Sequence, residues 1–381
     1  MNMVTVEQCC EILDSMRIPV TASERECGEY PYYGANGIQG YVSNYIFDDE
    51  LVLVAEDGGN FGSKEKPIAY RVSGKCWVNN HAHVLKPKEG LDVEYLCYSL
   101  MFYRVEGMIN GATRKKLTQK ALRQMKIPML KLDEQIKIAT QIKYIEMIKE
   151  KRLKQLQKLD ELIQARFVEM FGDPISNSLE SNMLPMTDVC EIIDGDRGKN
   201  YPTQEEFNEK GYCLFLNAKN VTNVGFNFDK CMFITKQKDE ILRKGKLCRG
   251  DVVLTTRGTI GNMAYYTEKI PFEHIRINSG MVILRMKHEI INEVFFIEQF
   301  KMQIANIKSK IASGSAQPQL PISTMNRIHI LIPDINSQNQ FADFVNQVHK
   351  SKFVERFLEL SLFYGLSSPL NSEMICIFPY F

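Results

Sequence analysis

Lysine and arginine side chains gather in two windows of this chain that contain no acidic residue. Neither residues 107–132 nor residues 299–333 include Asp or Glu. The basic residues are Arg114, Lys115, Lys116, Lys120, Arg123, Lys126 and Lys131 in the first window, and Lys301, Lys308, Lys310 and Arg327 in the second. Ammonium and guanidinium groups bind phosphate oxygens. The windows therefore predict two surfaces that face anions, although a short charge run can also be a solvated face.

Polar side chains in loops of both halves could add contacts to an extended anion such as a nucleic acid. Arg, Asn and Gln can form paired hydrogen bonds with base edges, while Tyr, Thr and Lys contact phosphates. For each residue alone, a turn or capping role is the commoner use. The candidates are Tyr32, Tyr33, Asn36, Asn79, Thr113, Arg114, Lys115, Lys116, Asn217, Lys219, Arg257, Asn278, Ser315, Gln317 and Gln319.

The two basic windows are equivalent parts of an internal repeat. A constant shift of 203 positions places Gly111 on Gly314 and Gln135 on Gln338 without a gap. Upstream, residues 51–54 match 252–255 and residues 78–79 match 277–278, at shifts of 201 and 199. A period near 200 is far too long for a solenoid repeat, so each copy should be a domain with its own core.

A catalytic role finds little support in the sequence. There is no Asn-Pro-Pro-Tyr or Asp-Pro-Pro-Tyr segment for amino-methyl transfer, no Phe-x-Gly-x-Gly loop for S-adenosylmethionine and no phosphate-binding loop. His81 and His83 could place two imidazoles on one side of a strand, but no third metal ligand is evident. Glu65 and Asp57 form only a loose likeness to a nuclease carboxylate cluster. We therefore expect no metal and no catalytic site.

The cysteines and the hydrophobic pattern indicate a cytoplasmic protein. The ten cysteines include no Cys-x-x-Cys pair and no spacing typical of a disulfide framework, which favours a reducing compartment. The first residues lack the features of a secretory signal, and no apolar run approaches the roughly 20 residues that a membrane span needs. The net charge of +1 does not indicate a uniformly basic protein.

Each half is predicted to have an α+β fold followed by a long helix. Residues 51–55 and 252–256 read as buried strands, while residues 91–107 and 293–310 have helical spacing. Residues 133–172 contain no Pro, and Gly only at the end, and carry apolar residues at spacings of three and four. A second helix after Pro333 presents Phe341, Phe344, Val345, Val348 and Phe353 on one face, a natural partner for the first stripe.

These patterns divide the chain into five parts. We predict a first domain at 1–132, a long helix at 133–172, a second domain at 173–333, a shorter helix at 334–364 and a divergent tail at 365–381. The first helix has more apolar surface than the second can cover, and an uncovered patch marks a protein interface. The predicted interface residues are Ile142, Ile145, Leu156, Leu159 and Ile163.

In these features the chain resembles the specificity subunits of type I restriction-modification systems. The resemblance is carried by the segments 32–37 (YYGANG), 54–58 (VAEDG), 111–117 (GATRKKL), 127–135 and 256–261 (TRGTIG), and it extends from Val4 to about Phe357. It departs from the family at the short second helix and the tail.

The resemblance implies a DNA-recognition subunit that catalyses nothing itself. Its two target-recognition domains would each read one half of a bipartite asymmetric DNA site, and the helices would pair as an antiparallel coiled coil that sets the spacer. The implied partners are double-stranded DNA, two modification subunits docked on the helices, and restriction subunits. Those partners, not this chain, would bind S-adenosylmethionine, ATP and Mg²⁺.

Two other functional classes remain as alternatives. A stand-alone nuclease or methyltransferase with divergent motifs would act on DNA without a partner. A coiled-coil interaction scaffold would retain no DNA even at low salt.

Overall fold

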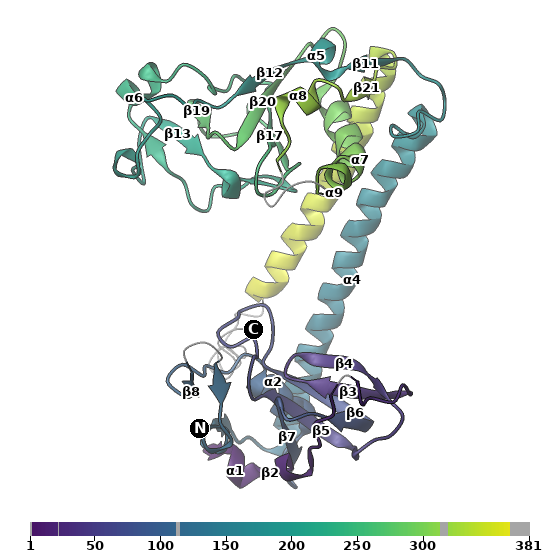
Figure 1. Ribbon diagram of the computed structural model, residues 1–381, viewed down its shortest axis with the longest axis vertical. Helices are drawn as coiled ribbons and strands as arrows, with labels where there is room; N and C mark the ends of the chain where they lie inside the picture. Colours follow the sequence, from purple (N-terminus) through teal and green to yellow (C-terminus); the bar gives the residue numbers. More distant parts are fainter. Residues whose placement is uncertain (1, 22, 112–114, 313–318, 366–381) are drawn as a thin grey trace. The chain divides into compact units, whose positions relative to one another are not determined.

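In the computed structural model the chain forms two compact units, one built on residues 1–152 and the other on residues 153–356 (Figure 1). The backbone is described for residues 2–21, 23–111, 115–312 and 319–365, and the side chains within these ranges are described except at 310–312 and 353–365. Both units combine sheets with helices, so the prediction of two mixed domains is confirmed. No helix in the described part of the chain is long and apolar enough to span a membrane.

Unit 1 is organised around a six-stranded sheet in the order β2-β7-β5-β6-β3-β4. The strands are β2 (Cys10–Ile12), β3 (Tyr30–Gly34), β4 (Gly37–Val42), β5 (Phe47–Ala55), β6 (Ala69–Val78) and β7 (Ala82–Pro87). Residues 51–55 of β5 are all fully buried, because alternate side chains point to opposite faces of the sheet and both faces are covered. Val52 and Val54 belong to one hydrophobic cluster, and Leu51 and Leu53 to another.

Short elements complete unit 1 around this sheet. Helix α2 (Val93–Met101) packs Tyr95, Leu96 and Leu100 into the cluster that contains Val52 and Val54. It is shorter than the predicted 91–107. The other elements are β1 (Met3–Thr5), α1 (Val6–Cys9), η1 (Asp14–Met16), β8 (Ile109–Asn110), β9 (Lys116–Leu117), α3 (Gln119–Arg123) and β10 (Lys126–Pro128), with β1 antiparallel to β10.

Unit 2 repeats this arrangement with one strand divided in two. In unit 1, β6 pairs with β5 along its first part and runs parallel to β3 at its end. In unit 2 these pairings belong to separate strands: β18 (Met263–Tyr265) pairs with β17 (Val252–Thr255), while β19 (Ile275–Ile277) runs parallel to β13 (Cys213–Leu216). Pro271 lies in the inserted segment between them and cannot donate to a ladder. The single sheet therefore becomes two, β12-β20-β17-β18 and β16-β13-β19.

The remaining elements of unit 2 surround these sheets. They are β11 (Met183–Pro185), α5 (Met186–Val189), β12 (Cys190–Asp194), η2 (Gln204–Glu206), η3 (Ala218–Asn220), β14 (Val221–Thr222), β15 (Gly225–Phe226), β16 (Phe233–Ile234), α6 (Lys236–Ile241), β20 (Met281–Met286), α7 (Glu293–Ala312), α8 (Ile322–Met325) and β21 (His329–Leu331). As β1 does with β10, β11 pairs with β21 in antiparallel fashion.

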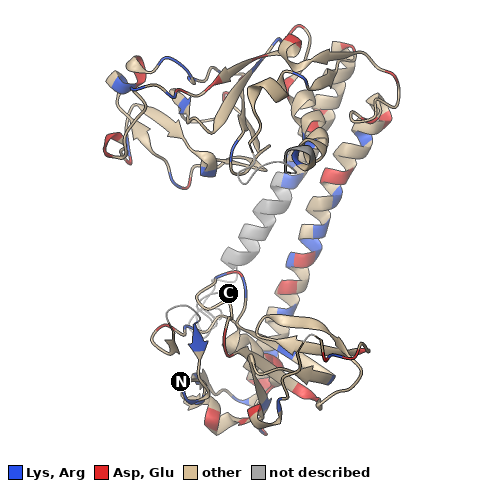
Figure 2. Cartoon of the chain, in the orientation of Figure 1, with Lys and Arg blue, Asp and Glu red and all other residues tan. Residues whose placement is uncertain are grey.

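Two long helices follow the sheets, as the sequence predicts. Helix α4 (Leu132–Phe171) has 40 residues and α9 (Ile335–Gly365) has 31. The compact units divide α4 between them, rather than leaving it as a separate spacer segment. Ala139 and Ile142 belong to the core of unit 1, whereas Ile163, Phe167 and Phe171 belong to that of unit 2. Residues of both charge signs follow one another along α4 (Figure 2). The tail after Gly365 lies outside the described residues.

Within unit 2 the end of α4 packs against the start of α9 through aromatic rings. Phe167 stacks on Phe295 of α7 with ring centroids 5.2 Å apart, and both Phe167 and Phe171 meet the edge of Phe341 at 5.4 and 5.7 Å. Earlier in α4 and later in α9, Asp160 forms an ion pair with Lys352. Offset and edge-on ring pairs add to the stability that burial alone provides.

Replacing Phe167 by Ala should destabilise unit 2 by about 3–5 kcal/mol, because a fully buried ring would leave a cavity among three other rings. Hydrogen exchange of the β17 and β20 amides in urea would measure this loss in unit 2 alone. Val168→Ala is the control, since Val168 is the next residue of α4 and is 41% exposed. Equal effects of the two substitutions would contradict the assignment of Phe167 to the core.

Candidate nucleic-acid interface

The turns at one edge of each unit share a set of hydrogen bonds. In unit 1 the backbone amide of Asn79 donates to the carbonyl of Tyr33 at 3.0 Å, and the side-chain oxygen Oδ1 of Asn79 accepts from the backbone amide of His81 at 2.8 Å. In unit 2 Asn278 forms the same two bonds, to the carbonyl of Leu216 at 3.1 Å and from the amide of Gly280 at 2.9 Å. The two asparagines therefore close equivalent turns in both copies.

The same edge holds one segment of each basic window. In unit 1 the Glu56 amide donates to the carbonyl of His81 at 2.8 Å, and the Leu117 amide donates to the carbonyl of Glu56 at 2.7 Å. In unit 2 Thr256 takes the place of Glu56, with Gly280 and Leu320 as partners, both at 2.9 Å. The bonds from Leu117 and Leu320 connect the turn after the central strand to the loop that the sequence predicts to face an anion, and the other two bonds connect that turn to the asparagine turn. The internal repeat thus extends to hydrogen bonding.

In unit 1 the β3–β4 hairpin is also fixed to this edge. Asn36 Nδ2 donates to the carbonyl of Gly58 at 3.0 Å, and Asn79 Nδ2 donates to Gln39 Oε1 at 3.1 Å. Gly58 has a φ of 61°, a left-handed conformation that glycine adopts at low cost. The hairpin, the turn after β5 and the turn before β7 therefore form one continuous polar edge.

Lys116, a predicted phosphate contact, is paired within the chain. Its ammonium lies 2.9 Å from Glu56 Oε1. Burial acts to raise the pKa of Glu56, but the bonds from Lys116 and Arg17 outweigh it and hold that pKa below its usual value. The neighbouring Lys115 is exposed. Lys115 is therefore better placed than Lys116 to add positive charge to this edge.

Behind Lys116 lies a buried network that joins the sheet to the loop. His83 is fully buried, with Nδ1 2.6 Å from Asp14 Oδ2 and Nε2 donating to the carbonyl of Leu117 at 2.8 Å. Arg17 bonds to Glu56 Oε2 at 2.7 Å. Burial acts to raise the pKa of Asp14, yet the bonds from His83, the Val84 amide and Gln119 leave it lowered. The network fixes Leu117 at two points, its amide and its carbonyl.

This network does not have the character of a metal centre. Asp14, Glu56 and His83 place ligand atoms within 4.8 Å of one another. However, Arg17 and Lys116 already neutralise the carboxylates, and a cation would have to displace them. The two imidazoles considered from the sequence also have different partners, since His81 pairs with Asp57 at 2.8 Å.

The equivalent edge of unit 2 lacks these charges. Thr256 occupies the position of Glu56 because it forms the same two backbone hydrogen bonds, and Val282 occupies that of His83 because it pairs with Leu254 as His83 pairs with Val54. The two central strands are therefore related by a shift of 200 positions, one fewer than the 201 aligned from the sequence. Thr256 Oγ1 donates to the carbonyl of Gly280 at 3.1 Å. Arg257 is exposed and forms a β-bridge with Gln319. The two units therefore present different side chains on the same backbone frame.

The structure corrects part of the predicted set of DNA contacts. Tyr32 is 1% exposed and its hydroxyl bonds to the backbone of Val20, so it packs the sheet. Asn79 is buried and closes a turn, and Asn217 Oδ1 accepts from the Lys219 amide in the same kind of role. Tyr33 and Asn278 are half-buried. The exposed members are Asn36, Lys115, Lys116, Lys219, Arg257 and Gln319, while Thr113, Arg114, Ser315 and Gln317 lie outside the described residues.

The predicted subunit-interface stripe on α4 is corrected as well. Ile142 and Ile163 are buried in the cores of their own units, and Leu159 packs against the second of these cores. Ile145 and Leu156 are half-buried. The apolar side chains that α4 exposes are instead Leu132, Ile136, Tyr144, Met147, Leu153, Leu162 and Val168.

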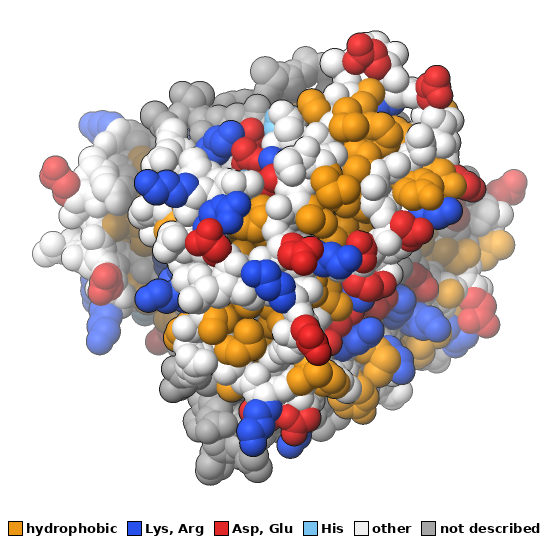
Figure 3. Space-filling view, turned by 90° about the horizontal axis from the view of Figure 1, so that it is seen from below, with side chains coloured by type: hydrophobic (Ala, Val, Ile, Leu, Met, Phe, Trp, Pro, Cys, Tyr) orange, Lys and Arg blue, Asp and Glu red, His pale blue; other side chains and the backbone are white. Residues whose placement is uncertain are grey.

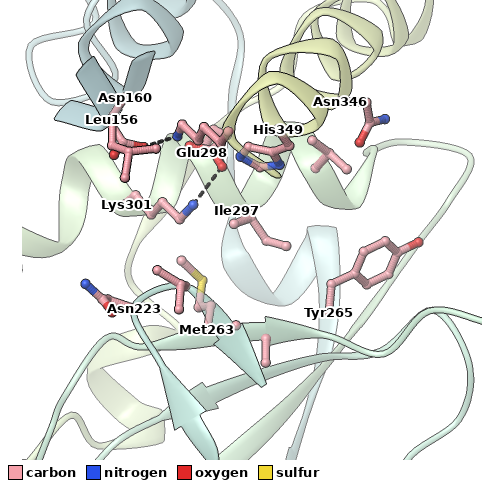
Figure 4. A pocket seen from close by; sticks show the side chains of 15 residues that line it. Leu156, Asp160, Asn223, Met263, Tyr265, Ile297, Glu298, Lys301, Asn346 and His349 are labelled. Atoms are coloured by element: carbon pink, nitrogen blue, oxygen red, sulfur yellow. Dashed lines mark hydrogen bonds and ion pairs between the residues drawn. The ribbon is translucent and has the colours of Figure 1, made fainter. Parts of the chain in front are cut away.

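Leu156 lines a cavity of about 460 Å³ between α4, α7, α9 and β18 (Figure 4). Two ion pairs lie in its wall, Lys352 with Asp160 and Lys301 with Glu298, the latter at 2.7 Å. Burial lowers the pKa of the nearby His349. The charged side chains in the wall are thus paired with one another, and they do not point together at a place where a substrate could react.

Charges of both signs are interspersed on the face shown in Figure 3, where hydrophobic side chains also reach the surface. This agrees with the near-neutral composition. This face therefore has no uniformly basic character. Sequence reasoning missed Asp14, Glu56 and Gln119, because no motif marks a network whose members are distant in the chain.

Comparison with known proteins shows which family has this architecture. The model of the family described as "Type I restriction modification DNA specificity domain" matches residues 1–158 and again residues 180–355. The chain belongs to this family. The two matches correspond to the two copies of the repeat, and they support neither the nuclease or methyltransferase alternative nor the scaffold alternative.

Individual relatives agree with this assignment. A putative type I restriction enzyme specificity subunit of Haemophilus influenzae is 39% identical over 133 residues, 35% of this chain and 34% of that protein. The aligned segment thus spans about a third of that relative. A putative type I specificity subunit of Mycoplasma pneumoniae is 19% identical over 88% of this chain and 86% of its own length. The crystal structure of a type I S subunit from M. genitalium has the same fold, with a TM-score of 0.57 at 17% identity over 95% of this chain and 93% of that one.

The buried network should make the stability of unit 1 depend on pH. Because Asp14 has a lowered pKa in the folded state, its contribution is present above about pH 4 and is lost as the pH falls further. Asp14→Asn should therefore lower stability at pH 7 and flatten its decline between about pH 5 and 2. Fluorescence of Trp77, the single tryptophan, reports unfolding of unit 1. Glu65→Gln, at an exposed acid of the same unit, should leave the decline unchanged; an unchanged decline in Asp14→Asn would contradict the network's role.

Proposed function

We propose that this chain is the DNA-recognition subunit of a type I restriction-modification complex, in which each unit reads one half of a bipartite, asymmetric site in double-stranded DNA. The observation that carries the proposal is the edge that recurs in both units with the same hydrogen bonds and different exposed side chains. A repeated frame can present two readers to DNA, and different side chains on it favour different half-sites.

In this proposal the chain is not an enzyme. Methylation and ATP-dependent cleavage would belong to two modification subunits and to restriction subunits, which would bind S-adenosylmethionine, ATP and Mg²⁺. The complex would work in the cytoplasm. The carboxylates at the described edge of unit 1, Glu56 and Asp57, are engaged in ion pairs with Arg17, Lys116 and His81, which supports a binding rather than a catalytic role.

The long helices would pair as an antiparallel coiled coil that sets the spacer between half-sites. The contacts inside unit 2 support this orientation. Phe171 and Phe167 meet Phe341, whereas Asp160, earlier in α4, meets Lys352, later in α9. We further propose that the modification subunits dock on the helices through exposed apolar side chains of α4, such as Tyr144 and Met147.

Exchanging one unit tests the proposed function. Residues 184–332 would be replaced by the same region of a relative with a different target, and the sites would be mapped by methylation of DNA in cells that carry the intact complex. Because each unit has its own core, one half-site should change while the other is kept. Loss of both half-sites, with the exchanged protein still folded and assembled, would contradict separate reading by the two units.

The loop at 111–117 should contribute to affinity through phosphate contacts. Lys115→Ala should lower the slope of log affinity against log salt by about 1, with a smaller effect for Lys116→Ala because Glu56 already neutralises Lys116. Replacing Arg114, Lys115 and Lys116 together should lower the slope by about 2 to 3. Fluorescence anisotropy with duplex DNA at several salt concentrations measures the slope. Lys86→Ala, whose ammonium is paired with Asp49, is the control; a triple variant with the wild-type slope would show that this loop faces away from DNA.

A further inference from the structure

A fully buried glutamine lies at the start of each long helix. In α4 this is Gln135, whose Nε2 donates to the carbonyls of Gly90 and Leu130, both at 2.9 Å. Its Oε1 accepts from the amide of Asp92 at 2.9 Å. One side chain therefore bonds to Gly90 just before α2, to Asp92 at the N-cap of α2 and to Leu130 in the segment that leads into α4.

Gln338 repeats these bonds at the start of α9. Its Nε2 donates to the carbonyls of Ile290 and Pro333 at 3.0 and 2.8 Å, and its Oε1 accepts from the amide of Asn292 at 2.9 Å. Gln338 is also fully buried. In both helices one bonded carbonyl comes from the fifth residue before the glutamine. The same three bonds thus occur in two units with different sequences around them.

Only a glutamine side chain satisfies this arrangement. Its amide supplies two donors and an acceptor in one plane at a fixed distance from the backbone. An ionised glutamate has no hydrogen-bond donor, and methionine has no N–H donor and only a weak sulfur acceptor. Asparagine is shorter by one methylene group. A replacement would leave buried carbonyls or a buried amide without a partner, and such groups destabilise the fold by their full cost of desolvation.

The bonded segments lead into helices that are packed in the core of each unit. Asp92 Oδ1 caps α2 by accepting from the Tyr95 amide, and Asn292 Oδ1 caps α7 by accepting from the Val294 amide. Tyr95 and Phe295, in the first turns of these helices, lie in the hydrophobic cores. Each glutamine therefore fastens the first turn of a long helix to a helix that is packed on the sheet.

A long helix amplifies a small change in direction at its base. Forty residues extend about 60 Å at 1.5 Å per residue, so a tilt of roughly 5° displaces the far end by about 5 Å. One base-pair step of DNA is about 3.4 Å. A helix that sets the distance between two half-sites must therefore be held firmly where it leaves each unit.

We propose that Gln135 and Gln338 are positioning residues that fix the direction of α4 and α9 relative to the sheets of their own units, and thereby determine which spacer length between half-sites the complex accepts. This inference rests on the proposed function, because it presumes a bipartite DNA site. It assigns no DNA contact to either glutamine.

The first test measures spacer selectivity of the assembled complex. Wild type, Gln135→Met, Gln338→Met and the control Gln157→Met would be compared on duplexes that carry the mapped site with its native spacer or with one base pair added or removed. Gln157 is an exposed glutamine of α4, so the control makes the same substitution on the same helix. Wild type and control should prefer the native spacer by about tenfold or more. In the two variants this preference should fall to within about twofold, while the penalty for a changed base pair within a half-site stays as in wild type.

The second test needs no DNA. Spin labels on unnatural amino acids at Lys120 and Lys151, both exposed in unit 1, report the direction of α4 in the full chain. Gln135→Met should broaden the distance distribution and Gln157→Met should not. If the methionine variant does not fold, Gln135→Asn, which keeps the amide but shortens its reach, takes its place. A sharp distribution together with an intact spacer preference would overturn the inference. A wild-type complex with no spacer preference would refute the proposed function instead. The label distances would still test whether Gln135 fixes the direction of α4.

Discussion

The polar edge that recurs in both units depends on one backbone hydrogen bond in each, from the Leu117 amide to the carbonyl of Glu56 and from the Leu320 amide to the carbonyl of Thr256. A surface loop that binds a ligand must expose its side chains and still be held in place. Here the attachment uses only backbone groups, and the strand that provides it is buried on both faces in unit 1. The side chains around it are therefore left to vary.

The two units use this freedom differently. Unit 1 surrounds the attachment with ionised groups, in which Arg17 and Lys116 neutralise Glu56 and His83 bridges Asp14 to Leu117. Unit 2 has Thr256 and Val282 at the matching positions, so neutral bonds and apolar packing suffice. Loss of one partner costs more in a buried ionic network than in a neutral one, because it leaves an uncompensated charge rather than an unpaired neutral group. The same backbone frame thus carries two surfaces of different chemistry.

The long helices show how one apolar stripe can serve several purposes. The spacing of residues in α4 predicts a helix with an apolar face, and that helix forms with bounds within one residue of the prediction. The apolar face, however, packs into two different cores: Ile142 lies in the core of unit 1 and Ile163 in the core of unit 2. Helical periodicity states that a face is buried, but it does not name the partner that covers it.

The sequence by itself determined the repeat, the two mixed domains, the central strands and both long helices, because these depend on local periodicity and on copies that can be aligned. It also predicted Asn36, Lys115, Lys219 and Arg257 as polar loop residues, and all four are exposed. Only the tertiary structure decided that Tyr32 and Asn79 are buried, that Lys116 is paired with Glu56 and that Gln135 fastens a helix. The physical reason is that each of these roles depends on a partner a dozen or more residues away, and neither spacing nor composition records which distant residues the fold brings into contact.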